Sequence, residues 1–410
     1  MNASHGYDRS FGVKHPFRAW IKNVSSRTLF VLIFSILLLS LPVQPSVAAG
    51  APFDCGGSVE KEVWALWDTQ VRDFLEKNLL QERLSKRGDV YALYDFQTYT
   101  HNMVAMARRC HKVDRLREVA RMIHEAYGTL EPIPPSSSRR QWVCKGGAIC
   151  NDKNRLLNRE VMLCSVQFLG LAASVANALV SLGNHNEEDR VFVRETVQVL
   201  TEHLLRWGDD GAIKSMRKAT AARPQDVKGG SSALFFTDKP LWLITIYAEL
   251  SGILQSPDIR DVTFDGLSIE EKARMREHVK TLLAFFNARI SIHPATEGRL
   301  KIAAFADLDR GYWRLYADNR YAGYEGDSKP VSCRRDDRGN YTMQVHIAAE
   351  SVPKREDIGW DISHARRLVH ALDALERNRS AMKEAFSLTD SQLPPENITT
   401  LFANAFVETM

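Results

Sequence analysis

The amino-acid sequence predicts an all-α protein built from antiparallel helical hairpins in two layers. Apolar residues recur at spacings of three and four over long stretches, which is typical of amphipathic helices. The stretches at residues 168–182 and 241–254 are instead apolar nearly all round, which predicts helices buried on every side. Strand-like alternation of useful length is confined to residues 341–347. Buried inner helices that alternate with amphipathic outer helices favour a two-layered α/α arrangement over a four-helix bundle.

In the first half of the chain, we expect helices over residues 59–86, 90–109 and 113–130. Prolines and serines then interrupt the pattern at residues 132–138 and indicate a loop. Two long helices follow, over residues 154–182 and 187–207, and a short turn joins them.

The second half begins with residues 208–236, which are rich in Gly, Lys and Ser and are expected to be irregular. Thr237 or Asp238 caps the next helix, which places Pro240 in its first turn. Ser268 and Glu271 form a capping-box pattern for a helix that reaches residue 289. Residues 294–356 are irregular and aromatic-rich, and the last two helices are expected over residues 363–379 and from residue 395 onward.

Residues 1–49 have the features of a secretory signal peptide. Residues 29–41 form an apolar run, preceded by five basic side chains. The run is too short to cross a bilayer core, which takes about 20 residues, and residues 46–49 supply small side chains for cleavage. Because the basic flank is long, an uncleaved anchor is the alternative, and membrane contact is expected only in that case. We therefore expect a signal peptide at residues 1–49 and a single all-α domain at residues 50–410, exported to the periplasm or secreted.

The basic charge of the chain belongs to this presequence. Residues 1–48 contain five Lys or Arg and one Asp, so subtracting their +4 from the +4 of the whole chain leaves a neutral remainder. Nucleic-acid binding depends on neutralising phosphates with basic side chains. A neutral domain has no global field for that purpose, which excludes nucleic acid as a partner.

All six cysteines follow the presequence, and an even number in an exported chain permits up to three disulfides with 15 possible pairings. Cys144 and Cys150 bracket a Gly-containing loop and are the favoured pair. A zinc site is the competing interpretation, but the sequence has no CxxC and no histidine pair at ligand spacing. We therefore expect disulfides, with no metal and no cofactor.

Polar and aromatic residues gather in three segments where an ordinary helix does not need them. In the first, residues 91–102, the side chains of Asp95, Thr98, Tyr99 and Asn102 form one stripe at helical spacing. The stripe can hydrogen-bond between helices or face a cavity. His101 lies beside it.

The second segment, residues 309–326, holds five aromatic residues within 13 positions, mixed with Arg, Asp, Asn and Gly. Aromatic faces beside such polar groups suit a sugar, which stacks its C–H face and hydrogen-bonds through its hydroxyls. The alternative is that the aromatics fix a long loop to the domain. The candidate side chains are Tyr312, Trp313, Arg314, Tyr321 and Tyr324.

The third segment, residues 359–367, begins a helix with Asp361 or Ser363 as its cap. Asp361, His364 and Arg367 then lie within one turn of each other. Helix amino termini favour anionic groups, and Arg grips a carboxylate at two points. The alternative is a capping Asp beside a histidine and arginines of no special role, and Asp238 likewise can be only a cap.

Long hairpins with apolar inner helices, and aromatic and acidic residues at helix starts, resemble the (α/α) toroid proteins that act on polysaccharides. These include six-hairpin glycoside hydrolases and toroid-type lyases such as alginate and heparinase-like lyases. The resemblance covers most of the domain as architecture, and as motif only residues 95–102, 237–242 and 360–364. It implies an (α/α) toroid or incomplete toroid with its substrate groove at the helix amino-terminal side. Ser363 and His364 are similar to the histidine-bearing helix starts of the lyases, whereas no general-acid pair of a hydrolase family is present.

From these features we expect an enzyme that cleaves an acidic polysaccharide by β-elimination. Asn102 or Arg367 would neutralise the uronate carboxylate, His364 or His101 would remove the C5 proton, and Tyr312 or Tyr321 would protonate the leaving oxygen. The alternatives are a glycoside hydrolase that uses Asp238 and Asp361 at a separation of about 5–9.5 Å, and a non-catalytic envelope protein that binds a glycan or partner. The expected substrate-binding side chains are Asp95, Tyr99, Asn102, Trp242, Trp313, Arg314, Tyr321, Tyr324, Trp360 and Arg367.

Overall fold

The computed structural model describes residues 53–134, 136–183, 186–223, 236–257, 259, 266–295, 303–309, 331–335, 341–345 and 362–408. This part of the chain is mostly helical and carries three small two-stranded sheets, which confirms the all-α prediction. The predicted signal peptide lies outside the described residues.

The helices of the first hundred or so described residues match their predicted ranges. A long helical segment begins with α2 (Ser58–Leu66) and continues through the wider π-helical turns of η2 (Trp67–Val71) and η3 (Phe74–Lys86). It is followed by α3 (Tyr91–Arg109) and α4 (Val113–Tyr127). Their buried side chains, such as Leu79, Phe96 and Ile123, come from the apolar positions that predicted the helices.

The middle of the chain departs from prediction in two places. Helix α5 (Met162–Ser181) begins eight residues later than expected, because Arg155 and Asn158 before it adopt left-handed backbone conformations. Helix α6 (Glu187–Trp207) lies as predicted, but α7 (Asp210–Ala221) occupies a segment predicted to be irregular. The side chain of Asp209 caps α7 by accepting a hydrogen bond from the Ala212 amide at 2.7 Å.

Two of the four α-helices that follow in the described residues begin at the predicted signals. Helix α8 (Asp238–Ile253) begins after Thr237, and α10 (Ile269–Arg289) begins with the predicted capping box at Ser268. Helix α11 (Ile362–Phe386) is longer than predicted and has a kink at Asn378, and α12 (Ile398–Glu408) follows. At the kink, Asn378 has non-helical backbone angles, and its side-chain amide donates to the Ala374 carbonyl at 2.9 Å.

The strands form three antiparallel pairs. Of these, only β6 (Tyr341–Val345), which pairs with β5 (Val331–Arg335), falls within the predicted alternation. The pair β1 (Glu131–Ile133) and β2 (Ser136–Gln141) replaces the loop predicted there. The pair β3 (Ile290–Pro294) and β4 (Ala304–Leu308) was likewise missed, and β4 lies in the segment predicted to be irregular.

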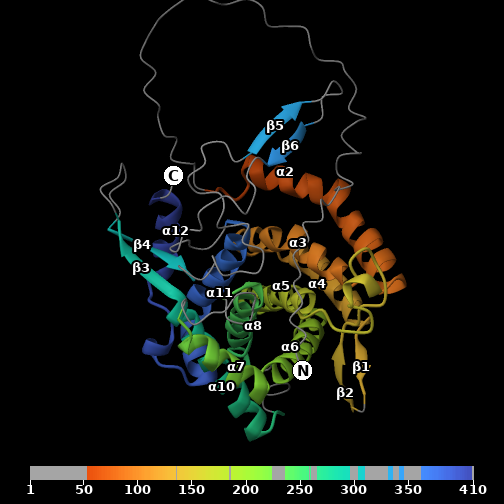
Figure 1. Cartoon of the computed structure of the whole chain (residues 1–410). Coiled ribbons are helices and arrows are strands. Elements are labelled where there is room, and N and C mark those ends of the chain that lie inside the picture. The colour runs from red at the N-terminus through yellow and green to blue at the C-terminus, as the bar shows by residue number, and fades with distance from the viewer. Residues whose placement is uncertain are drawn as a thin grey trace, which may run out of the picture.

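Helices α3, α5, α8 and α11 run in the same direction. Residues near their starts contact one another, as Gln97 contacts Gln167, and Asp238 contacts Arg367. Residues near their ends do the same, as Glu249 contacts Arg377. Helices α4 and α6 return in the opposite direction after short turns, and α5 and α8 lie at the centre of the molecule (Figure 1). This arrangement brings four helix amino termini to one end of the domain.

The two apolar stretches of the sequence form central helices, as predicted. Helix α5 is buried along almost its whole length, and so is α8. By length and composition, α5 is the one helix of the described residues that could cross a membrane, but 89% of its apolar window is buried inside the protein. It therefore serves as a core helix. Trp242 of α8 packs on it at Gly170, where an added Cβ would lie 2.6 Å from the indole.

The described residues contain two disulfides. The predicted Cys144–Cys150 pair is confirmed, and Cys55–Cys110 ties the start of α2 to the end of α3. Cys164 is a buried free thiol, and burial raises its pKa well above the usual range. The two disulfides indicate an oxidising, extracellular environment.

Candidate functional site

Charged and aromatic side chains meet at the amino-terminal ends of α3, α8 and α11. Arg367 donates to the phenol oxygen of Tyr94 at 2.7 Å and forms an ion pair with Asp238 at 3.2 Å. The neighbouring Arg366 donates to the same phenol oxygen and to Thr98 Oγ1, each at 3.3 Å. Two guanidinium groups thus converge on one phenol. Arg367 is buried, whereas Arg366 is exposed to solvent.

Three aromatic rings are stacked one turn deeper in the bundle. The rings of His101 (α3) and His370 (α11) lie 3.8 Å apart between centroids, at an interplanar angle of 18°. The indole of Trp242 lies 5.5 Å from His101 and 5.7 Å from His370. His101 and Trp242 are buried, and His370 is half-buried.

Both histidines of the stack are neutral at neutral pH. Burial lowers the pKa of His101 well below its usual value. Burial and the positive charges of Arg366 and Arg367 lower the pKa of His370 to about 4. Within the described chain, His370 has ring contacts but no hydrogen bond, so the unprotonated nitrogen of its neutral ring is available as a proton acceptor.

A buried chain of hydrogen bonds leads from this end of the bundle into its interior. Gln167 Nε2 lies 2.6 Å from Gln97 Oε1, and Gln97 Nε2 lies 3.0 Å from His101 Nδ1. His101 Nε2 lies 3.4 Å from Ser174 Oγ, which is 2.9 Å from Glu249 Oε1. All five side chains are buried. The chain therefore crosses between α3, α5 and α8 without contact with solvent.

The carboxylate of Glu249 is enclosed by three further donor side chains besides Ser174. Arg377 donates to both carboxylate oxygens, at 2.5 and 3.2 Å, and Asn177 donates at 2.6 Å. The amide of Asn378 adds a longer contact at 3.3 Å. Burial raises the pKa of Glu249, while the hydrogen bonds from Asn177 and Ser174 lower it.

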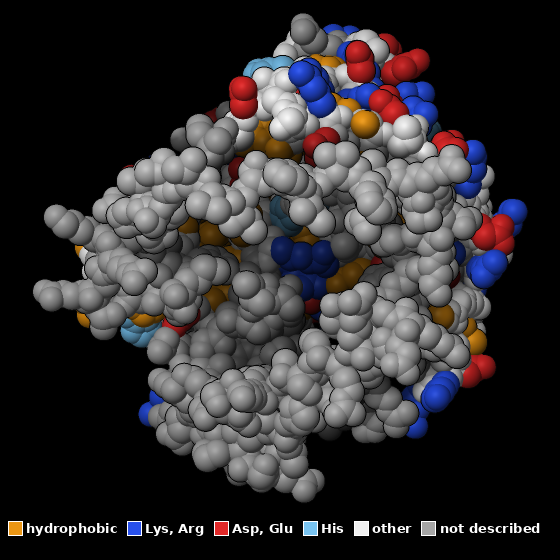
Figure 2. All heavy atoms as spheres, turned by 90° about the horizontal axis from the view of Figure 1, so that it is seen from above, with side chains coloured by type: hydrophobic (Ala, Val, Ile, Leu, Met, Phe, Trp, Pro, Cys, Tyr) orange, Lys and Arg blue, Asp and Glu red, His pale blue; other side chains and the backbone are white. Residues whose placement is uncertain are grey.

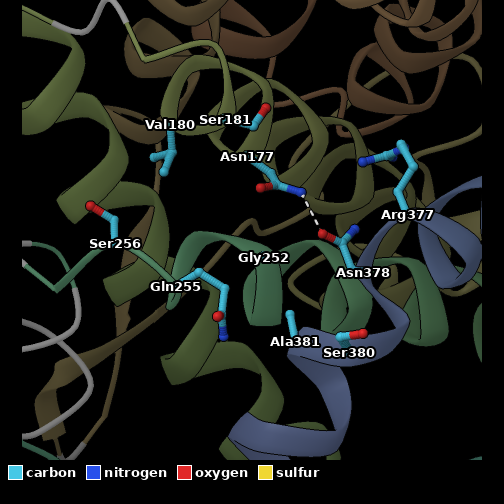
Figure 3. A pocket seen from close by; sticks show the side chains of 10 residues that line it. All are labelled: Asn177, Val180, Ser181, Gly252, Gln255, Ser256, Arg377, Asn378, Ser380 and Ala381. Carbon is cyan, nitrogen blue, oxygen red and sulfur yellow. Dashed lines mark hydrogen bonds between the residues drawn. The ribbon is translucent and has the colours of Figure 1, made fainter.

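These donors also form the floor of a hollow at the opposite end of the bundle, with a volume of about 520 Å³. Figure 3 shows Asn177 and Asn378 facing each other across the floor, with Arg377 at one side. Its lining is mixed, with polar side chains beside Val180 and Ala381, and the charged group among these lining residues, Arg377, is already paired with Glu249. The hollow is therefore separate from the stacked rings but touches the far end of the hydrogen-bond chain.

Two buried polar atoms near the stack have no hydrogen-bond partner among the described residues. They are Trp242 Nε1 and Gln167 Oε1. Buried polar groups nearly always find a partner, so each of these atoms calls for an ordered water molecule or a ligand group. The amino-terminal end of the bundle thus has unused hydrogen-bonding capacity.

Of the residues predicted from sequence, the structure brings four together at this end: His101, Trp242, Asp238 and Arg367. His101 differs from its expected role, because both of its ring nitrogens are engaged and its ring is 5% exposed. It lacks a nitrogen with which to accept a substrate proton.

Of the predicted stripe on α3, Thr98 joins this group by accepting from Arg366, whereas Asp95, Tyr99 and Asn102 point away from it. Asp95 forms an ion pair with Arg83 at 2.6 Å. Tyr99 is 43% exposed and packs edge-on against Phe74, and Asn102 is exposed. The polar stripe that faces the interior consists instead of Gln97 and His101, four residues apart on the adjacent face of the helix.

The other predicted site residues cannot be placed. The side chain of His364 lies outside the described set, and so do Tyr312, Trp313, Arg314, Tyr321, Tyr324, Trp360 and Asp361. The predicted separation of Asp238 and Asp361 therefore stays a prediction.

Sequence reasoning missed Tyr94, Gln97, Gln167, Glu249 and His370. For Gln167 and Glu249, the signal was a polar residue inside an otherwise apolar helix. Glu249 is the one acidic residue within the apolar run 241–254, and Gln167, Ser174 and Asn177 recur at helical spacing in α5. Because burying such groups is costly unless they are paired, their presence predicts an interior network.

On the face seen in Figure 2, the described residues carry charges of both signs. Basic side chains are visible near the middle of this view. No family model, no curated protein and no solved structure matches this chain. The functional argument therefore rests on the site itself.

Proposed function

We propose that this protein is an exported carbohydrate-active enzyme that cleaves an acidic polysaccharide by β-elimination, on an (α/α) toroid or incomplete toroid framework. The framework is supported by four helices that run in the same direction, with returning helices between them. The single observation that carries the function is the convergence of Arg366 and Arg367 on Tyr94 at the helix amino termini. Helix amino termini and guanidinium groups both favour an anionic ligand.

Arg366 is the side chain suited to bind the uronate carboxylate. It is exposed, and its contacts within the described chain use Nη2 alone, which leaves Nε and Nη1 to donate to a ligand. A guanidinium that holds a carboxylate at two points also stabilises the negative charge that develops when the C5 proton leaves. Arg367, buried between Asp238 and Tyr94, fixes the phenol in place.

His370 and Tyr94 supply the proton transfers. Neutral His370 accepts the C5 proton, and Tyr94 donates its phenolic proton to the glycosidic oxygen as the C4–O bond breaks. The sugar keeps the electron pair as a C4–C5 double bond. His364, Tyr312 and Tyr321 remain the alternatives for these two roles.

Hydrolysis has less support. Asp238, one of the two carboxylates that it would need, is ion-paired with Arg367 and its side chain is only 14% exposed. A glycan-binding protein without turnover is the second candidate, since the same arginines would bind a uronate.

The purified exported form is incubated with alginate, pectate and glycosaminoglycans, and the ultraviolet absorbance of the unsaturated product is followed. Arg366→Ala should lower kcat/KM by about 10- to 100-fold, since a hydrogen bond to a charged group contributes about 1.5–3 kcal/mol. Arg87→Ala is the matched control, because this exposed arginine pairs only with Glu82 among described residues. Binding of a uronate polymer without any product would favour the glycan-binding protein. Equal activity of both variants would place the site elsewhere.

A further inference from the structure

The hydrogen-bond chain has a direction that its two ends determine independently. At one end, the Tyr94 carbonyl can only accept, so the Gln167 nitrogen 3.3 Å from it must be the donor amide. That orientation makes Gln167 donate to Gln97 Oε1. Gln97 then presents its own NH₂ group to His101 Nδ1.

At the other end, the Glu249 carboxylate accepts from Arg377 and Asn177, so it also accepts from the Ser174 hydroxyl. Ser174 has then used its single proton and can only accept from His101 Nε2. Both ends therefore require the same tautomer, in which His101 Nδ1 accepts and Nε2 carries the proton.

We propose that Gln167, Gln97, Ser174 and Glu249 are positioning residues that hold His101 in this tautomer and, through the stacked His101 ring, orient His370 in the site. The inference rests on the proposed function for the use made of His370. The stack is the means of coupling, since the two imidazoles lie 3.8 Å apart and nearly parallel. Among described residues, His370 has no hydrogen bond of its own to fix its ring. Trp242, packed on Gly170, supports both histidines at 5.5 and 5.7 Å.

The arrangement explains why charged and polar groups are buried in the centre of an apolar bundle. Removing one member leaves its neighbours unpaired, so the chain specifies one ring orientation at a cost in burial. It also separates the two histidines by role. His101 has both nitrogens engaged, while His370 keeps its nitrogens for a ligand.

The test is ¹⁵N NMR of the histidine-labelled exported form, with His101 assigned by its absence in a His101→Gln variant. We expect the Nε2–H tautomer of His101 in the wild type. Ser174→Ala removes the acceptor of that proton, so the ¹⁵N shifts should move toward a mixture of tautomers, and the His370 signals should shift with them. Ser251→Ala is the control, because this buried serine of α8 bonds to Ala248 of its own helix at 2.7 Å. It should leave both histidines unchanged.

A second variant should give the tautomer opposite to that of the wild type. Gln97→Glu replaces the donor at Nδ1 by an acceptor, so His101 should place a proton on Nδ1. An Nδ1–H tautomer in the wild type, or unchanged His101 and His370 signals in Ser174→Ala, would overturn the inference whatever the activity.

The kinetic readout separates positioning from binding. Ser174→Ala should lower kcat for uronate cleavage roughly tenfold or more, as expected for a misplaced catalytic group. KM should not change, because Arg366 is untouched. A shifted tautomer with unchanged kcat would overturn the link to His370. Absence of cleavage in the wild type refutes the proposed function, while the NMR result still decides whether the chain holds the histidines.

Discussion

The two disulfides should contribute unequally to stability, because they close loops of very different length. Cys55 and Cys110 are 55 residues apart, and Cys144 and Cys150 are 6 apart. If a disulfide acts by restricting the unfolded chain, its contribution grows with the logarithm of loop length. The expected contributions are about 4 kcal/mol for Cys55–Cys110 and about 2 kcal/mol for Cys144–Cys150.

Replacing the cysteines would confound the comparison, since Cys144 and Cys150 are buried and their sulfur atoms also pack in the core. Each disulfide is therefore measured within a single variant, by comparing the stability of that variant with and without reductant. C144A/C150A, unfolded in urea with and without reductant, measures Cys55–Cys110, and C55A/C110A measures the other pair. The free energy of unfolding should fall about 2 kcal/mol more on reduction in the first variant. Equal losses, or a larger loss in the second, would refute the loop-length reasoning.

Three further predictions concern packing, pH and charge. Gly170→Ala places a methyl group 2.6 Å from the Trp242 ring and should lower the free energy of unfolding, measured by urea titration, by about 1–3 kcal/mol. The control is Gly211→Ala on the exposed surface of α7. An unchanged unfolding midpoint in Gly170→Ala would show that the indole can shift freely. Burial lowers the pKa of His203 to about 4, so the unfolded chain takes up a proton at this histidine first as the pH falls from about 6.5. The free energy of unfolding should therefore drop between about pH 6.5 and pH 4. The drop should be smaller in His203→Phe, and an equal drop would contradict the lowered pKa of His203. Arg377→Ala leaves the Glu249 carboxylate, whose side chain is 1% exposed, without its ion-pair partner. It should lower the free energy of unfolding, measured by thermal unfolding, by about 3–5 kcal/mol. Combining it with Glu249→Leu should recover part of this loss, and a purely additive loss would argue against coupling between the two residues.

The helices were predictable from sequence because burial sets their pattern. The apolar runs of α5 and α8 and the capping box at Ser268 each correspond to a described feature. The start of α5 was not predictable, since the residues before it are helix-compatible in composition and only their left-handed backbone at Arg155 and Asn158 ends the pattern. Helix α7 was missed because its Gly, Lys and Ser content hides a weak apolar face, of which Ile213 and Ala219 are buried.

The site was predictable only where one helix carries the signal. Asp238, Trp242 and Arg367 were identified because they lie near helix starts. His370 and Tyr94 were not, because their roles arise from rings and charges on other helices, and a single sequence does not show which helices are neighbours. The stripe at Asp95 and Tyr99 shows the same limit. Periodicity predicts a polar face correctly but leaves open whether that face meets a cavity, a neighbouring helix or solvent.

The most direct test of the proposed site is a crystal structure of the exported form with a bound uronate oligosaccharide. The two ends of the helix bundle offer two polar surfaces, one at Arg366 and Tyr94 and the other in the hollow at Arg377. The proposal predicts the sugar at the first, with its carboxylate on the guanidinium of Arg366 and its C5 facing His370. A uronate found in the hollow beside Asn177 and Asn378, with the amino-terminal end empty, would contradict it.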